Sequence, residues 1–162
     1  MKTLLILRHA KSSWDDHGLR DHDRPLSPRG ARDAPRMGRH IMDEDLVPET
    51  IISSTAVRAL STAELAAGRM SPSPRIETTP ELYLASPHDY LEVLDELGGD
   101  AERVMVVGHN PGITALVTRL TGVLEEMPTA ALAAVDLDID TWGEISSGPR
   151  GELRGFWIPK EL

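Results

Sequence analysis

Residues 3–11 read Thr-Leu-Leu-Ile-Leu-Arg-His-Ala-Lys, an apolar run that stops abruptly at Arg8 and His9. A short run without an interior polar residue is typical of a strand that is buried on both faces of a parallel sheet. Residues 104–112 repeat the design, since Val-Met-Val-Val ends in Gly-His-Asn-Pro-Gly with His109 at the break. Ligands of open α/β sheets bind beyond the carboxyl ends of the strands, so we expect both imidazoles at one edge of the sheet.

Signals for strands and helices alternate along the rest of the chain. Ser-Pro pairs at 27–28 and 86–87 each supply a helix N-cap followed by proline at the first helical position. Residues 10–25 are polar and read as a long loop, and loops of that length are often functional. The alternation predicts a single α/β domain over residues 1–162. Helices are expected at about 28–42, 57–68, 86–97 and 112–120, and strands at about 3–7, 50–53, 75–78, 103–107, 131–138 and 152–158, the last two joined through a Gly/Pro/Ser turn near 146–151.

Charge limits the classes of partner. The 26 acidic and 17 basic residues give a net charge of −9. An acidic surface repels phosphate backbones and anionic lipid heads, which argues against nucleic-acid and membrane partners. Fourteen of the 17 basic residues are arginines. Arginine suits bidentate grips on phosphate or carboxylate, although the base composition of a genome can produce the same bias.

Cysteine usage and the N-terminal sequence limit the chemistry and the location. The chain has no cysteine, which excludes a disulfide framework, a thiolate metal site and a cysteine nucleophile. The apolar run near Met1 is too short for a signal peptide or a membrane span. These features predict a cytoplasmic protein.

The two strand ends define a candidate site. A third strand-to-helix junction, at residues 53–58, adds Arg58 to Arg8, His9 and His109 at the same edge. This set is a poor metal site, because a guanidinium repels cations, and a good anion site, because guanidinium forks match phosphate oxygens. A neutral imidazole among cations can act as a nucleophile toward phosphorus, with the other groups stabilising the charge on the transferred group. The residues alone leave open that each histidine is only a polar residue at a strand end.

The same residues carry a resemblance to a known family. Arg8-His9-Ala10 resembles the Arg-His-Gly signature of the histidine phosphatase superfamily, also called phosphoglycerate-mutase-like. Further blocks follow in the family's order and spread over most of the chain: Leu-Ser-Pro-Arg-Gly at 26–30, Ser-Ser at 53–54 with Arg58 and Thr62, and Gly-His at 108–109. The short chain, the Arg-His-Ala-Lys-Ser start and the Gly-His-Asn-Pro-Gly block look most like the small bacterial phosphohistidine phosphatases.

This resemblance implies a three-layer α/β/α sandwich around a mostly parallel sheet, and a reaction that needs no metal or other cofactor. His9 would be the nucleophile that becomes phosphohistidine. Arg8 and Arg58 would hold the phosphate oxygens, and His109 would donate a further hydrogen bond to the phosphoryl group. Water would then hydrolyse the phosphoenzyme.

Four other positions follow from the resemblance. Ser12 and Asp15 lie where larger members place polar residues of the substrate pocket. Ala10 stands where glycine is usual, which leaves less room beside the backbone. Larger members use a carboxylic acid to protonate the leaving group, and Glu81 is the candidate by its order in the chain, the alternative being a solvated loop carboxylate. A phosphoramidate leaves more readily than an alkoxide, so a weak or missing acid would fit a phosphohistidine substrate.

Together these features predict a metal-independent phosphatase. Phosphohistidine on a protein is the favoured substrate, because the chain is too short for large capping insertions and an open pocket suits a protein-borne phosphoryl group. The alternatives are a small-molecule phosphomonoesterase on the same fold and a non-catalytic phosphate-binding module. The expected partner is a phosphorylated protein or a small phosphate ester, and the chain is expected to be a monomer or a weak homo-oligomer. The Asp- and His-rich residues 15–23 lack the ligand spacing of a metal site and read as a solvated loop. We expect His9 and His109 to lie within ~10 Å of each other, the reach of one phosphoryl group.

Overall fold

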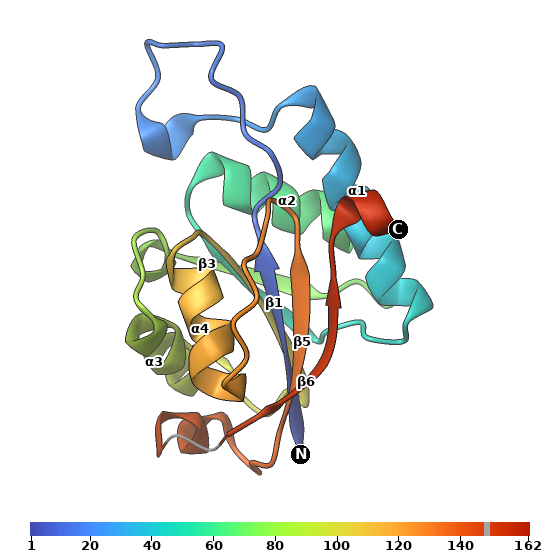
Figure 1. The fold of residues 1–162 in the computed structure, drawn as a ribbon, viewed down its shortest axis with the longest axis vertical. Coiled ribbons are helices and arrows are strands. Elements are labelled where there is room, and N and C mark those ends of the chain that lie inside the picture. Colours follow the sequence, from blue (N-terminus) through green and yellow to red (C-terminus); the bar gives the residue numbers. More distant parts are fainter. Residues whose placement is uncertain (148–149) are drawn as a thin grey trace.

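A six-stranded sheet in the order β3-β2-β4-β1-β5-β6 forms the middle of the molecule (Figure 1). The computed structural model describes residues 1–147 and 150–162. Neighbours among β3, β2, β4 and β1 pair in parallel, whereas β5 is antiparallel to β1, and β6 is antiparallel to β5. The predicted mostly parallel sheet is therefore confirmed. The strands are β1 (Lys2–Arg8), β2 (Thr50–Ser54), β3 (Arg75–Thr79), β4 (Arg103–Gly108), β5 (Leu132–Leu137) and β6 (Glu152–Trp157).

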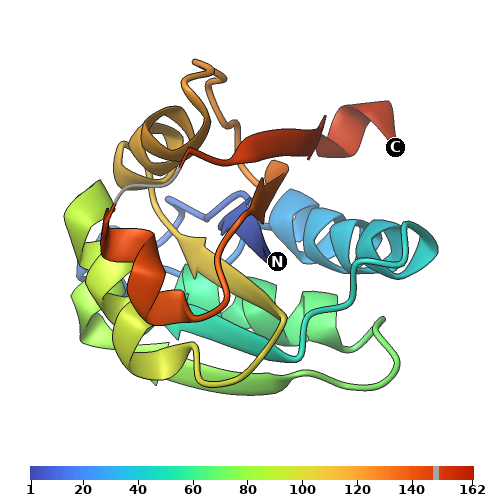
Figure 2. The ribbon, with the colours of Figure 1, turned by 90° about the horizontal axis from the view of Figure 1, so that it is seen from below.

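Two pairs of helices cover the two faces of the sheet, as Figure 2 shows. Helices α1 and α2 pack on one face, and α3 and α4 on the other. This is the three-layer α/β/α sandwich that the resemblance implied. The helices are α1 (Pro28–Asp43), α2 (Val57–Ala67), α3 (Pro87–Leu97) and α4 (Gly112–Thr121).

The side chains of the central strands enter the two cores alternately. In β1, Leu4 and Ile6 join the core under α3 and α4, whereas Leu5 and Leu7 join the core under α1 and α2. Burial on both faces explains why this strand has no polar residue between Thr3 and Arg8, because the four side chains between them all lie in a core under a helix layer.

The cap signals act as the sequence predicts. The Ser27 hydroxyl accepts a hydrogen bond from the Gly30 amide at the start of α1, and the Ser86 hydroxyl accepts one from the Asp89 amide at the start of α3. Each satisfies one amide that the helix itself leaves without a partner. Gly30 also allows close packing, because a Cβ there would overlap the backbone of Lys11 at the start of the long loop.

The connections differ from the expectations in detail. Residues 10–25 contain a 3-10 helix, Asp21–Asp23, and Ser12 forms an isolated β-bridge with Leu26. Figure 1 shows this segment rising beyond the carboxyl end of β1. A second 3-10 helix, Trp142–Ser147, occupies the beginning of the turn predicted before β6. Residues 148–149 of that predicted turn lie outside the described part of the chain.

No helix in the described ranges is both long and apolar enough to cross a bilayer.

Candidate active site

Strands β1 and β4 end side by side and bring the two histidines together. Arg8 lies opposite Gly108 in the parallel register, and the His9 amide donates to the Gly108 carbonyl at 3.0 Å. The two imidazole centroids are 5.1 Å apart, with their planes tilted by 50°. The expected convergence of His9 and His109 is therefore confirmed.

The His9 side chain is held as a neutral imidazole with a defined tautomer. Its Nδ1 lies 2.7 Å from the Ala10 carbonyl oxygen. A carbonyl can only accept, so Nδ1 carries the proton and Nε2 keeps its lone pair. Burial lowers the pKa of His9 to about 3, the hydrogen bond to Ala10 opposes this, and the nearby charges of His109, Arg58 and Arg8 lower it further. At neutral pH the ring is therefore unprotonated at Nε2, as a nucleophile requires.

The tautomer of His109 follows from Ser54 at the end of β2. The Ser54 hydroxyl accepts from the Ala56 amide at 3.1 Å and lies 2.8 Å from His109 Nε2. We assign the hydroxyl proton to the bond with Nε2, which places the ring proton of His109 on Nδ1. Burial and the charge of Arg58 lower the pKa of His109 to about 4, against the opposing effect of Asp21. His109 is thus a neutral hydrogen-bond donor through Nδ1.

Three buried N–H groups around His9 have no hydrogen-bond partner among the described residues: Arg8 Nε, Arg58 Nε and His109 Nδ1. All three residues, together with His9, line a cavity of about 240 Å³. A buried donor without a partner costs free energy, and such groups are rare in folded proteins. Donors gathered around one cavity are the arrangement expected of a site that receives a multivalent anion.

Both arginines are fixed by their outer nitrogens. Arg8 Nη1 donates to the Met127 carbonyl at 3.0 Å. Arg58 Nη1 donates to the Asp21 carbonyl at 2.7 Å, and Arg58 Nη2 donates to the Asp21 carboxylate at 3.0 Å. The two guanidinium groups are therefore oriented before any ligand arrives, which lowers the cost of binding one.

Asp21 and Tyr83 belong to the site, although sequence reasoning did not single them out. The Tyr83 hydroxyl donates to the Asp21 carboxylate at 2.6 Å. This bond, followed by the one from Arg58, lowers the pKa of Asp21 to about 2, against the opposing effect of burial. Both residues line a second cavity of about 590 Å³, which shares Arg58, His109 and Asn110 with the first. The Asp/His-rich segment around Asp21 was the only signal in the sequence, and it does not say which carboxylate turns inward.

Ala10 and Thr62, two positions of the family resemblance, help to hold the site in place. The Ala10 amide donates to the Thr62 hydroxyl at 3.0 Å, and that hydroxyl donates to the Arg58 carbonyl at 2.7 Å. Thr62 thus ties the end of β1 to α2. The Ala10 methyl is buried against Ala34, Ala130 and Leu26. It fills a small apolar cluster, which explains how alanine is accommodated in place of glycine.

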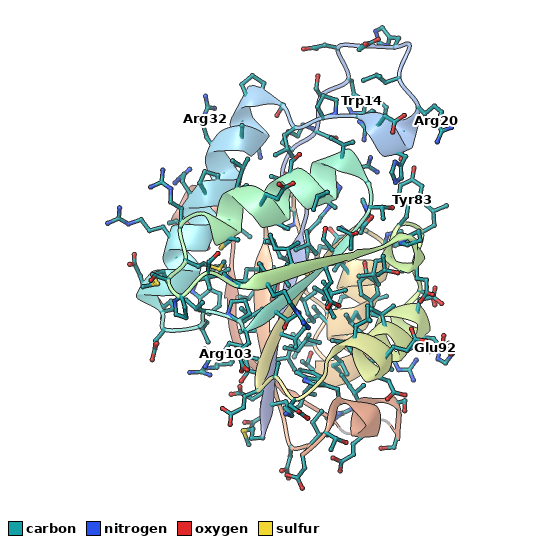
Figure 3. All side chains as sticks on the ribbon, turned by 180° about the vertical axis from the view of Figure 1, so that it is seen from behind. Trp14, Arg20, Arg32, Tyr83, Glu92 and Arg103 are labelled. Atoms are coloured by element: carbon teal, nitrogen blue, oxygen red, sulfur yellow. The ribbon has the colours of Figure 1, made fainter. Side chains whose placement is uncertain are left out.

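Of the other residues predicted for the site, Ser12 lines a site cavity, whereas Asp15 and Glu81 do not. Ser12 is buried and lines the smaller cavity. Asp15 is exposed on the loop and is not among the lining residues of either site cavity. Glu81 is exposed and lines a separate depression whose other residues are Asp89, Glu92, Asp95 and Glu96. Figure 3 shows Glu92 on α3, apart from Tyr83 and Trp14 at the site end of the molecule. This placement gives the acid role predicted for Glu81 no support.

Removing the Ser54 hydroxyl tests the tautomer assignment. In Ser54→Ala, His109 loses the group that fixes its ring proton on Nδ1, and kcat/KM is expected to fall by about tenfold, the worth of one ordinary hydrogen bond. Nitrogen-15 chemical shifts of His109 should show a mixture of tautomers. Ser53→Ala is the matched control, because Ser53 is equally buried but donates to the Ser54 carbonyl instead. Equal effects in the two variants would contradict the assignment.

The lowered pKa of His9 also predicts how stability depends on pH. The unfolded chain binds a proton on this ring near pH 6.5, whereas the folded chain does so only near pH 3. The neutral, buried ring of His9 therefore makes its full contribution to the free energy of unfolding above pH 6.5, and this contribution is lost as the pH falls toward 3. From pH 7 to pH 5, the free energy of unfolding should fall by an amount on the order of 1–2 kcal/mol more in the wild type than in His9→Gln. Urea unfolding measures this, with the exposed His17→Gln as control; equal losses in wild type and His9→Gln would refute the burial argument.

A protein-family model and the sequences of relatives in other organisms match this chain. A model of the histidine phosphatase superfamily (branch 1) matches residues 4–83. An uncharacterised protein of Mycobacterium tuberculosis is 32% identical over 95% of this chain and 100% of its own length. An uncharacterised chloroplast protein of Arabidopsis thaliana is 31% identical over 98% of this chain and 78% of its own length.

Solved structures extend the similarity to the whole fold. A structure from Agrobacterium tumefaciens, assigned as the phosphohistidine phosphatase SixA, superposes with a TM-score of 0.83 at 29% identity and covers 98% of both chains. The protein histidine phosphatase SixA in complex with tungstate superposes with a TM-score of 0.81 at 25% identity and covers 99% of both chains.

Proposed function

The chain belongs to the histidine phosphatase superfamily, and we propose that it hydrolyses phosphohistidine on proteins through a phosphorylated His9. The observation that carries the proposal is the set of three buried donors without partners around the Nε2 lone pair of His9. A phosphoryl group in the smaller cavity would accept from Arg8, Arg58 and His109 while its phosphorus faces Nε2.

The reaction proceeds in two displacements. In the first, His9 Nε2 forms a bond to phosphorus while the bond from phosphorus to the leaving nitrogen breaks; the substrate ring, protonated on its other nitrogen, leaves as neutral imidazole and needs no proton from the protein. In the second, water attacks phosphorus, the bond to Nε2 breaks, and inorganic phosphate leaves with the neutral ring restored. Charge on the transferred oxygens is stabilised in both steps by the same donors, whose positions are already fixed.

The leaving group would occupy the larger cavity. That cavity adjoins the phosphoryl position through Arg58 and His109. Its wall combines polar groups such as Asp21 and Tyr83 with the apolar side chains of Leu84, Ala85, Pro87, Pro111 and Ala115. A planar imidazole fits such a wall, with its N–H directed at the Asp21 carboxylate. Imidazole needs less help from a proton donor than an alkoxide does, which agrees with an ionised Asp21 and an exposed, distant Glu81.

The similarity to SixA supports a protein-borne substrate. The chain matches the tungstate complex over almost its full length, and tungstate is a tetrahedral oxyanion of the same shape as phosphate. The structures of small-molecule phosphatases that also superpose are less than 20% identical and share the fold alone.

A substrate panel tests the proposal. Phosphohistidine peptides, phosphoserine peptides and p-nitrophenyl phosphate are compared at equal concentration, with and without a chelator. The proposal expects kcat/KM to be highest on phosphohistidine, by at least about tenfold, and unchanged by the chelator. Preference for the ester would favour the phosphomonoesterase alternative, and phosphate binding without any turnover would favour a binding module.

A further inference from the structure

The outer side of α1 carries a concentration of cations that the site does not use. A cavity of about 510 Å³ is lined by Ala31, Pro35 and four arginines, and none of these lining residues is acidic. A neighbouring cavity of about 530 Å³ shares two of these arginines. We refer to the cations of both cavities as the basic face, which consists of Arg29, Arg32, Arg36, Arg39, Arg69 and Lys160.

Folding alone does not account for the basic face. Arg29, Arg32, Arg36 and Arg39 follow one another at helical spacings of three and four, where like charges destabilise a helix by a few tenths of a kcal/mol per pair, roughly. The first turn of α1 contains no acidic residue, although the positive end of the helix dipole favours one there. Ion pairs with Asp33 and Asp43 offset part of this cost, but Arg32 has no ion pair within the described ranges, so stabilisation of the helix does not explain it.

One buried carboxylate orients part of this face. Asp33 lies 3.5 Å from Arg29 and 3.4 Å from Arg36, and its own side chain is only 8% exposed. Arg36 is further held by the Pro159 carbonyl. Arg32 and Arg69 form no ion pair within the described ranges, and Figure 3 shows Arg32 projecting from α1 into solvent. The face thus combines fixed arginines with exposed ones that have no acidic partner.

The basic face continues to the phosphoryl site. Thr129 lines both the cavity of about 530 Å³ on the basic face and the cavity around His9. Lys11 lines the site cavity, and its carbonyl accepts from the Ser27 amide just before α1. From Arg29 to Arg39 the helix extends about 15 Å. A partner whose phosphoryl group enters the site would therefore also lie along α1.

We propose that the basic face is the docking surface for an acidic, Asp- and Glu-rich surface of the phosphoprotein substrate, an inference that rests on the proposed function. Guanidinium forks pair bidentately with carboxylates, so charge complementarity identifies the occupant. A long nucleic acid fits less well, because exposed Asp43, Glu44 and Asp45 end the face at the C-terminus of α1 and the net charge is −9. A discrete acidic patch on a protein can avoid those carboxylates.

Direct binding tests the docking surface without any turnover. A fluorescent Glu-rich peptide, the same peptide with Gln in place of Glu, and a single-stranded oligonucleotide are titrated by anisotropy. The double variant Arg32→Glu/Arg69→Glu should bind the Glu-rich peptide about tenfold more weakly than the wild type, from the loss of two exposed pairs and the new repulsion. The control Arg75→Glu/Arg119→Glu changes net charge equally on exposed positions elsewhere and should bind almost as the wild type does.

Turnover then connects docking to catalysis. On a phosphohistidine peptide with acidic flanks, Arg32→Glu/Arg69→Glu should raise KM about tenfold and leave kcat unchanged, and on p-nitrophenyl phosphate it should change neither. Equal binding of the Glu and Gln peptides, equal loss in both double variants, or tighter binding of the oligonucleotide would overturn the docking proposal. Acidic-peptide binding that depends on Arg32 and Arg69, together with no hydrolysis of any phosphohistidine peptide, would instead refute the proposed function and the assignment of the bound partner as its substrate.

Discussion

Alanine in place of His9 is expected to reduce phosphate release by at least about 10⁴-fold, because the reaction then lacks the atom that carries the phosphoryl group between the two displacements. The expected loss is large because the other potential nucleophiles that line the cavity, Lys11, Ser12 and Thr129, lack the neutral imidazole nitrogen of His9. His109 lies nearby, but its Nε2 is hydrogen-bonded to the Ser54 hydroxyl, and the tautomer assigned above places the proton on its Nδ1. Steady-state assays with a phosphohistidine peptide measure the loss.

Anion binding provides the control for this variant. Arg8, Arg58 and His109 keep their donors in His9→Ala, so inorganic phosphate and tungstate should still bind, within a few-fold of the wild-type affinity. Isothermal titration measures this and also shows that the site is folded. A His9→Ala protein that keeps more than about one hundredth of wild-type turnover would mean that another group attacks phosphorus.

Lysine in place of Arg58 is expected to lower kcat/KM by about 10²–10³-fold, the usual effect of removing one preorganised donor from a developing anion. Lysine keeps the positive charge but has neither the buried Nε donor, which has no partner among the described residues, nor the second nitrogen that pairs with Asp21. The loss should therefore come from geometry rather than from charge.

Arg24 supplies a matched control for Arg58. It is equally buried, lines the same cavity and also pairs with Asp21, at 3.2 Å. Its Nε is already used by that pair, and its guanidinium stacks on Trp14 at 3.4 Å from the ring centroid. Arg24→Lys should lower kcat/KM by less than about fivefold. Similar losses in the two variants would show that positive charge in the cavity, and not an oriented donor, is what the reaction needs.

The part of the site that the sequence predicts consists of residues whose position follows from local structure. Arg8, His9 and His109 end buried strands, and Arg58 begins the helix after a third one, so parallel pairing alone gathers them. The bounds of the helices agree with the cap signals for the same reason, since a cap is a local hydrogen bond.

The residues that the sequence does not reveal depend on how distant loops pack. Asp21 reaches Arg58 across 37 positions and Tyr83 across 62. Nothing local marks that carboxylate within a run of similar residues. Glu81 shows a related limit, because order along the chain gives no direction for a side chain, and the 3-10 helix Pro80–Leu82 places it over an acidic depression.

The net charge of −9 is not distributed evenly over the surface. Acidic residues gather on surfaces such as the depression along α3, whereas the site and the basic face are locally positive. Screening over ~8–10 Å separates such regions in physiological salt. An acidic protein can therefore present a cationic surface to an acidic partner.

Identification of the phosphorylated atom tests the central claim most directly. The protein is mixed with a ³²P-labelled phosphohistidine peptide, quenched in alkali within milliseconds, digested and mapped, and the isomer is assigned by phosphorus NMR on an unlabelled sample. We predict one phosphate on Nε2 of His9, stable to base, labile to acid and absent from His9→Ala. Turnover without a covalent phosphate, or with the phosphate on His109 or on Nδ1 of His9, would contradict the account.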